Sequence, residues 1–399
     1  MLESFDPLRR VQHISRFIGQ VVGEEKGPSL IFFGGIHGNE PAGVKALEHL
    51  FNTLEKNVFK IRGTLVGIRA NLPALLQGKR FLDQDLNRLW TEEKMAEIKA
   101  KPSAEREREE MELLELEQLI GEILIAYEPP FYFIDFHTTS SKTLPFITIN
   151  DALINRKFSQ QFPLPIILGI EEFLEGPLLS RMNKLGYVSL GFESGQHVAE
   201  SAVKNSIAFL WLTLVFAGAL PKQDVLHFDS YYEELRSSAN EDSNFYEVTY
   251  RHELRKRDDF SMLNGYTSFQ KVTKGTFMAI QNRKKILAKE NSILFMPLYQ
   301  KQGAEGFFLI KKTPKWALKI STLFRKSKFD RLLCLLPGIS WSSTTKESLL
   351  VNLSVARYFT KSFFHLLGYR NRQVDKTQII MHNRERAAKN EMYRNTPWY

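Results

Sequence analysis

The sequence is poor in cysteine and lacks a long apolar stretch. Its single cysteine, Cys334, cannot form an internal disulfide, which excludes the secreted domains that disulfides hold together. The longest apolar run, residues 207–220, is shorter than the ~20 residues of a membrane-spanning helix and predicts a buried core helix. The N-terminal residues show no signal-peptide pattern. We therefore expect a soluble, cytoplasmic protein.

Acidic residues are scarce only near the end of the chain. Residues 315–399 contain sixteen Lys and Arg but five Asp and Glu, a net charge of +11, whereas residues 1–314 contain 38 basic and 40 acidic residues. Apolar pairs such as Leu335-Leu336 interrupt the basic residues, so we expect helices that pack on the body or on a partner subunit. The alternative is an amphipathic helix on an anionic membrane surface. We do not favour nucleic-acid or membrane binding by this segment, although its charge leaves both open.

The first two hundred residues alternate strand-like and helix-like segments. Short apolar runs predict buried strands at Ser29–Gly34, Gly63–Ala70, Phe131–Phe136 and Gly186–Phe192. Apolar residues at helical spacing predict helices at Pro41–Leu54, Glu92–Tyr127 and Glu200–Phe216, the second interrupted near residue 102. This alternation predicts an α/β fold whose sheet has parallel strands and is flanked by helices.

The pattern changes after residue 223, where short β-rich segments separated by turns replace the alternation. We therefore predict three parts: an α/β domain over residues 1–223, a smaller β-rich domain over 224–314, and a basic helical extension over 315–399.

Ionisable residues follow several of the predicted strands. His37 and Glu40 come after the first strand, in a loop that opens a helix, and His137 comes directly after FYFIDF. Ligands bind outside the carboxyl ends of the strands in open α/β sheets, so these side chains should converge there. Imidazole and carboxylate groups are zinc ligands, and a catalytic site uses three of them. The alternatives are a loop histidine at 37, a carboxylate favoured by the helix N-terminus at 40, and a histidine capping a buried strand at 137.

Four ordered motifs carry a resemblance to a known family. They read GGIHGNEPAG, NLPALLQGKRFLDQDLNR, DFHTTSS and GFESGQH. With a later β-rich stretch ending in GFFLIKK, they resemble the succinylglutamate desuccinylase/aspartoacylase family, relatives of the zinc carboxypeptidases, from about Leu30 to Lys312. The resemblance implies a zinc-carboxypeptidase-like mixed sheet flanked by helices and a β-rich domain that narrows the active-site entrance. It also implies one Zn²⁺ per chain and hydrolysis of the amide bond of an N-acyl amino acid.

The resemblance also assigns roles to individual residues. It implies that the zinc ligands are His37, Glu40 and His137. Glu193 matches the general base, and Arg80 matches the arginine that polarises the scissile carbonyl. Asn87 and Arg88 match the pair that holds the α-carboxylate of the substrate. Arginine suits that role because its planar fork binds a carboxylate through two parallel hydrogen bonds.

Neighbouring residues suggest supporting roles. Asp135 is expected to contact His137, since zinc-bound histidines usually have a hydrogen-bonded partner. Asp85 is expected to orient Arg88. His197 is expected either to lie in the wall of the site or to face solvent. Without the resemblance, the alternatives are a salt-bridged loop for residues 80–88 and a surface carboxylate at residue 193. Arg181 is not in register with the arginine that reads the acyl group in some relatives, so the acyl group stays open.

Three kinds of function agree with these residues. The first, which we favour, is a zinc-dependent N-acyl amino acid amidohydrolase with a small-molecule substrate. Whether the chain forms a homo-oligomer stays open. The second is a zinc carboxypeptidase acting on short peptides, which a wide cleft would favour. The third is a non-catalytic binding protein that works through the basic extension, which the retention of all four of His37, Glu40, His137 and Glu193 disfavours.

Overall fold

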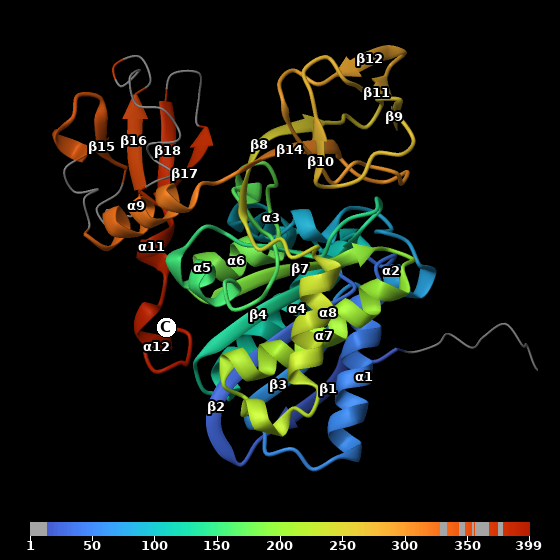
Figure 1. Ribbon diagram of the computed structural model, residues 1–399, viewed down its shortest axis with the longest axis vertical. Helices are drawn as coiled ribbons and strands as arrows, with labels where there is room; N and C mark the ends of the chain where they lie inside the picture. The colour runs from blue at the N-terminus through green and yellow to red at the C-terminus, as the bar shows by residue number, and fades with distance from the viewer. Residues whose placement is uncertain (1–13, 328–332, 343–347, 353–354, 356–366, 374–377) are drawn as a thin grey trace, which may run out of the picture.

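The computed structural model describes residues 14–327, 333–342, 348–352, 355, 367–373 and 378–399. Residues 1–13 of the first predicted domain and the remaining parts of the extension lie outside this range. Within the described residues, an 11-stranded mixed sheet forms the centre of the molecule (Figure 1). Its strands, in spatial order, are β1 (Phe17–Val22), β3 (Arg62–Arg69), β2 (Glu25–Gly34), β4 (Phe131–Thr139), β7 (Val188–Gln196), β5 (Phe146–Thr148), β6 (Ile166–Leu168), β8 (Phe245–Glu253), β14 (Glu305–Lys312), β13 (Ser292–Phe295) and β10 (Gln270–Val272).

The four strands at the heart of this sheet are parallel, as the sequence predicts. β2 pairs in parallel with β3 and β4, and β4 pairs in parallel with β7. All nine residues of β4 are buried, which matches its continuous apolar sequence. The carboxyl ends of β2, β4 and β7 therefore meet at one edge of the sheet.

Alternate side chains of β2 enter two separate cores. Leu30 and Phe32 lie in one core, and Ile31 and Phe33 lie in the other. The first core is covered by α1 (Ala42–Lys56), α5 (Leu153–Ser159), α7 (Glu200–Ala217) and α8 (Phe228–Ser238). The second is covered by α3 (Glu92–Ala100), α4 (Arg108–Ala126) and α6 (Leu178–Lys184). Two further short elements, α2 (Leu72–Gln77) and the single-turn helix η1 (Leu86–Arg88), follow β3. The sheet is thus flanked by helices on both faces.

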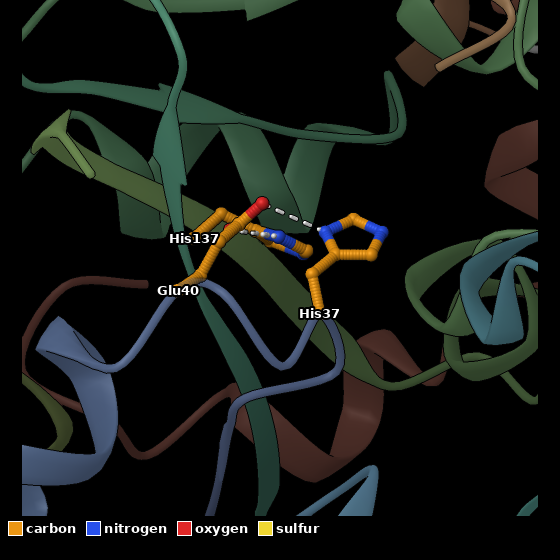
Figure 2. Close-up of side chains that lie close together, drawn as sticks. All are labelled: His37, Glu40 and His137. Atoms are coloured by element: carbon orange, nitrogen blue, oxygen red, sulfur yellow. Dashed lines mark hydrogen bonds and ion pairs between the residues drawn. The ribbon is translucent and has the colours of Figure 1, made fainter. Parts of the chain in front are cut away.

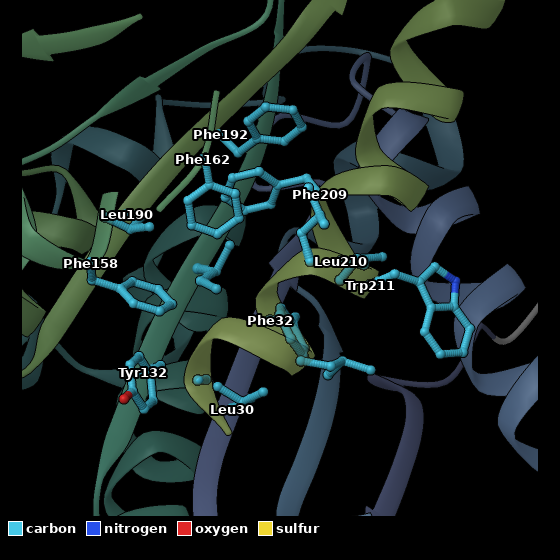
Figure 3. Close-up of a cluster of buried hydrophobic side chains, with 14 of the residues drawn as sticks. Leu30, Phe32, Tyr132, Phe158, Phe162, Leu190, Phe192, Phe209, Leu210 and Trp211 are labelled. Atoms are coloured by element: carbon cyan, nitrogen blue, oxygen red, sulfur yellow. The ribbon is translucent and has the colours of Figure 1, made fainter. Parts of the chain in front are cut away.

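The predicted core helix is α7. Its side chains pack against aromatic residues of the sheet and of α5, and the rings of Phe192 and Phe209 stack 4.0 Å apart (Figure 3). The helix ends at Gly218, whose positive φ of 86° lets its N–H bond back to Leu214 and Val215. The predicted interruption of the long helical stretch also occurs, between α3 and α4.

The β-rich segment continues the large sheet. β8 pairs in parallel with β6, and β14 pairs with β8, so four strands of this segment extend the central sheet. A second sheet of three strands lies beside them in the described residues: β12 (Lys284–Leu287), β11 (Phe277–Gln281) and β9 (Phe260–Met262). The division of the chain at residues 223 and 314 stays a prediction.

The prediction of a helical extension is wrong beyond its first helix, α9 (Lys315–Lys326). In the described residues the chain then forms a four-stranded antiparallel sheet: β15 (Ile339–Trp341), β16 (Ser348–Asn352), β18 (Gln378–Asn383) and β17 (Tyr369–Gln373). Leu349, Val351, Ile379 and Met381 alternate along these strands and form a small core of their own. This core forms only when strands that are distant in the sequence pair with each other. The local spacing of apolar residues does not show such pairing. Two short helices follow, α11 (Arg384–Ala387) and α12 (Asn390–Tyr393).

The extension packs on the body, as expected. The side chain of Leu318 on α9 and those of Tyr393 and Trp398 join the first core. The guanidinium of Arg325 is fully buried and lies 2.8 Å from Asp151, in the loop before α5. In Figure 1 the end of the chain returns along the body next to α12. Among the described residues, none of the helices combines the length and the apolar composition needed to cross a bilayer.

Candidate metal centre

Three buried side chains meet where β2 and β4 end. His37 and Glu40 lie in the loop between β2 and α1, and His137 lies on β4 (Figure 2). One potential ligand atom from each of the three lies within 4.8 Å of the others. The loop must pass close to α2, because a Cβ on Gly38 would lie 2.1 Å from the backbone of Ala74. The sequence prediction of this convergence is confirmed.

Glu40 contacts both histidines of the cluster. One of its oxygens lies 2.9 Å from His37 Nδ1, and the other lies 3.2 Å from His137 Nδ1. The second oxygen also accepts a hydrogen bond from the backbone N–H of Thr138. Burial alone would raise the pKa of the Glu40 carboxyl, but the two imidazoles hold that pKa well below its usual range. The carboxylate is therefore ionised and available to a cation.

A carboxylate holds the second nitrogen of each histidine. His137 Nε2 lies 2.8 Å from Asp135 Oδ2, which confirms the predicted contact. His37 Nε2 lies 3.1 Å from Asp85 Oδ1. Burial alone would lower the pKa of His137, but Asp135 and Glu40 raise it well above its usual value. Histidines that ligate metals commonly donate their other ring N–H to such a carboxylate, which fixes the ring orientation.

Glu193 lies beside this cluster on β7. The register of the two strands pairs Glu193 directly with His137. Its Oε2 atom is buried and has no hydrogen-bond partner among the described residues, and the same is true of Asp135 Oδ1. Burial raises the pKa of the Glu193 carboxyl to about 8, although the nearby His137 opposes that rise. Orphaned buried oxygens are rare, and these two belong to residues beside the three potential ligands.

Arg80 also reaches the centre, while Asp85 has a different partner from the one expected. Arg80 Nη1 lies 3.5 Å from Glu40, and Arg80 Nη2 lies 3.0 Å from Asp85 Oδ2. Asp85 thus binds Arg80 and His37, and the prediction that it orients Arg88 is wrong. The side chain of Asp85 caps η1 by accepting from the N–H of Asn87, so its oxygens face the centre.

Asn87 and Arg88 follow Asp85, and their side chains make different contacts. Asn87 Nδ2 lies 3.5 Å from His137 Nε2, and its Oδ1 accepts from the N–H of Leu178. Arg88 instead contacts the β-rich segment: its Nη2 lies 3.3 Å from both carboxylate oxygens of Glu305 on β14. The sequence analysis missed Glu305, because it is 217 residues away and belongs to none of the four motifs.

A cavity of about 650 Å³ opens next to Asp85 and Arg88. Its other walls come from the β-rich segment, from residues 254–264 and 298–304. The second of these two segments, which we call the 298–304 loop, is tied to the loops of the metal centre by several hydrogen bonds. Gln300 accepts from Asn39 at 2.9 Å, and the N–H of Tyr299 donates to Ser140.

His197 contacts the 298–304 loop but is not among the residues that line the cavity, so its predicted place in the wall of the site stays a prediction. Its Nδ1 lies 2.7 Å from the hydroxyl of Thr138, and its Nε2 lies 3.2 Å from Gln300 Oε1. Burial lowers its pKa, so the ring is neutral near pH 7. Arg181 lies elsewhere and binds Glu117 on α4 at 3.0 Å. It is therefore not part of the cluster.

The first half of the chain is similar to a known family. Residues 26–176 match the model of the succinylglutamate desuccinylase/aspartoacylase catalytic domain. The succinylglutamate desuccinylase of Pseudomonas putida (strain GB-1) is 39% identical over 67 residues, which are 17% of this chain and 20% of that protein. That of Photorhabdus laumondii is 37% identical over 67 residues, 17% of this chain and 21% of that protein. The matched part thus spans about a fifth of the length of these curated relatives.

Solved structures share the fold over most of the chain. A succinylglutamate desuccinylase/aspartoacylase from Rhodobacter sphaeroides has a TM-score of 0.54 at 14% identity, covering 74% of this chain and 88% of that one. A succinylglutamate desuccinylase from Vibrio parahaemolyticus has a TM-score of 0.52 at 18% identity, covering 74% and 86%. A product-bound ectoine utilization protein from Ruegeria pomeroyi has a TM-score of 0.52 at 17% identity, covering 73% and 87%. These likenesses confirm the predicted fold.

Proposed function

We propose that this chain, whose residues 26–176 belong to the succinylglutamate desuccinylase/aspartoacylase family, hydrolyses the amide bond of an N-acyl amino acid with the help of one Zn²⁺. The convergence of three buried ligand atoms within 4.8 Å, beside the orphaned carboxylate of Glu193, carries this proposal. A binding protein without catalysis would have no use for that carboxylate, because an unpaired buried acid costs stability.

The residues at the centre fit a zinc ion. His37, Glu40 and His137 would hold it, since two imidazoles and one carboxylate form a common catalytic zinc set. Asp135 and Asp85 would orient the two rings through their second nitrogens. When bound, zinc lowers the pKa of water to near ~7 and polarises a carbonyl oxygen.

Glu193 and Arg80 supply the acid–base and electrostatic groups. The positive charge of a bound zinc would favour the ionised form of Glu193, whose pKa burial raises to about 8. The ionised carboxylate accepts a proton from the attacking water at its unpaired Oε2 and delivers it to the leaving nitrogen of the amide. Arg80 turns its guanidinium toward Glu40, and in that position it stabilises negative charge that develops on the scissile carbonyl oxygen. Its contact with Asp85 holds the guanidinium in place.

Arg88 and Asn87 bind the α-carboxylate of the substrate in this proposal. Arg88 lies on the wall of the 650 Å³ cavity, where a small molecule reaches it from solvent. The 298–304 loop narrows the entrance, because Gln300 and Tyr299 tie it to the loops of the metal centre. This narrow entrance favours a small N-acyl amino acid as substrate over the short peptides of the alternative, a zinc carboxypeptidase.

Cytoplasmic location and homo-oligomerisation stay predictions.

A substrate panel with metal analysis tests the proposal. The purified full chain is analysed for zinc and then incubated with N-succinyl and N-acetyl derivatives of several amino acids and with short peptides. We expect about one zinc per chain, release of free amino acid from at least one N-acyl substrate, and loss of activity in a chelator that added zinc reverses. Cleavage of the peptides alone would support the carboxypeptidase, and a metal-loaded chain inactive on the whole panel would contradict both.

A further inference from the structure

The helix α9 presents an apolar stripe to solvent. Trp316 is 65% exposed, Ile320 is 37% exposed, and Leu323 is 65% exposed. Residues four and three positions apart lie on one face of an α-helix, so these three side chains form one continuous surface. Exposed Trp and Leu side chains side by side are unusual in a folded protein and mark an interaction surface.

Lysines line one edge of this stripe. At about 100° per residue, Lys315, Lys319 and Lys326 fall within a narrow arc next to Leu323. All three are exposed, and α9 contains no acidic residue. Burial lowers the pKa of Lys157, and the nearby ammonium of Lys326 adds to this effect, so the two lysines lie close together at this end of the helix.

The opposite face of α9 is fixed to the protein, so the stripe cannot turn inward. Arg325 is fully buried in ion pairs with Asp151 and Glu385, 2.8 Å and 2.9 Å away. Leu318 packs on the first core, and Phe324 packs on the core of the four-stranded sheet. The stripe is therefore a stable feature of the folded surface.

We propose that this face of α9, comprising Trp316, Ile320, Leu323 and the three lysines, docks on a lipid surface that carries anionic headgroups. A Trp and two aliphatic side chains next to a row of lysines match the chemistry of an interfacial helix, whose apolar side enters the acyl boundary while its cations meet the headgroups. A second copy of the chain is disfavoured, because a two-fold contact would bring two all-cationic edges together. The short stripe gives weak, reversible and salt-sensitive association.

Vesicle co-sedimentation of the full chain tests the proposal. Vesicles of phosphatidylcholine alone are compared with vesicles containing about 30% phosphatidylglycerol, at about 50 mM and about 500 mM salt. We expect sedimentation with the anionic vesicles at low salt and release at high salt. Binding should also shift the tryptophan fluorescence of the full chain to shorter wavelength. The chain has five tryptophans, and Trp316→Phe tests which of them reports the binding. This variant should still sediment, but its fluorescence should no longer shift.

Two variants separate the apolar and charged contributions. Trp316→Ser/Leu323→Ser should abolish sedimentation, and Lys319→Gln/Lys326→Gln should weaken binding about fivefold per lysine. The matched control is Leu226→Ser, which removes an 89% exposed leucine from the body and should bind like the unaltered chain. Thermal unfolding of each variant checks that the fold is retained.

The proposal is overturned if the full chain does not sediment with anionic vesicles at low salt. Equal binding to neutral vesicles, or unchanged binding by the serine double variant, would overturn it as well. If the chain instead shows salt-sensitive binding to polyglutamate that the α9 variants abolish, the partner is an acidic protein and the lipid proposal is wrong.

Discussion

Arg88 and Glu305 form an ion pair that joins the metal-centre loops to the β-rich segment, with Arg88 Nη2 3.3 Å from both carboxylate oxygens. Glu305 is the first residue of β14, and both side chains are largely buried. The carboxylate of Glu305 thus lies beside the guanidinium to which we assign the α-carboxylate of the substrate. An anionic substrate would approach Arg88 against this negative charge.

Removing Arg88 should weaken substrate binding more than it slows chemistry. In Arg88→Ala the substrate carboxylate loses a charge-assisted hydrogen bond in both the ground state and the transition state. We expect KM to rise about 10- to 100-fold with a smaller change in kcat. Steady-state kinetics on the best substrate of the panel measures both, and an unchanged KM would contradict the carboxylate-binding role.

Neutralising Glu305 should have the opposite effect. In Glu305→Gln the repulsion between Glu305 and the incoming carboxylate is removed, so we expect KM to fall about fivefold, equivalent to ~1 kcal/mol. High salt should shrink this difference. The control is Glu290→Gln, which breaks the exposed contact with Lys311 and should leave KM unchanged. A higher KM in Glu305→Gln would show that Glu305 instead holds Arg88 in place.

Replacing His137 should strip the metal. His137→Ala deletes one of the three ligands, and we expect elemental analysis to find little zinc in a protein with the far-UV spectrum of the unaltered chain. Asp135→Asn should keep the metal but weaken its affinity about 10- to 100-fold, because the ring of His137 loses its carboxylate partner. His49→Ala, on the exposed face of α1, is the control. Full zinc occupancy in His137→Ala would refute the ligand assignment.

Glu193→Gln should separate binding from turnover. The amide keeps the shape of the side chain but cannot accept the proton, so we expect kcat to fall about 10²- to 10⁴-fold with zinc content and KM nearly unchanged. Glu200→Gln, at the exposed start of α7, is the matched control. Near-normal kcat in Glu193→Gln would assign the proton transfer to another group.

The convergence of the candidate site residues could be predicted from the sequence because they follow predicted strands. His37 and Glu40 follow β2, while His137 and Glu193 lie near the ends of β4 and β7. Parallel pairing brings these strand ends together. The roles of these residues as zinc ligands and general base came from the family resemblance and stay a proposal.

The parts that could not be predicted depend on contacts distant in sequence. Asp85 was expected to orient Arg88. The capping of η1 by Asp85 directs its oxygens to Arg80 and His37 instead, and Arg88 meets Glu305 on β14. In the extension, the apolar residues of β16 and β18 are buried against each other across a sheet, which their local spacing did not show.

Tyr393 should fix the end of the chain to the starts of β4 and β7. Its buried hydroxyl donates to the carbonyl of Phe131 and accepts from the N–H of Val188, at the starts of β4 and β7. Tyr393→Phe removes the hydrogen bonds that the hydroxyl forms with these two buried backbone groups, so we expect the free energy of unfolding to fall by about 1–3 kcal/mol. Urea denaturation measures this change. The control is Tyr232→Phe, whose hydroxyl forms no hydrogen bond among the described residues, and which should stay within about 0.5 kcal/mol of the unaltered chain. Equal stability of the two variants would mean that water replaces the Tyr393 hydroxyl and that the other contacts of the extension, such as those of Arg325 and Trp398, hold it to the body.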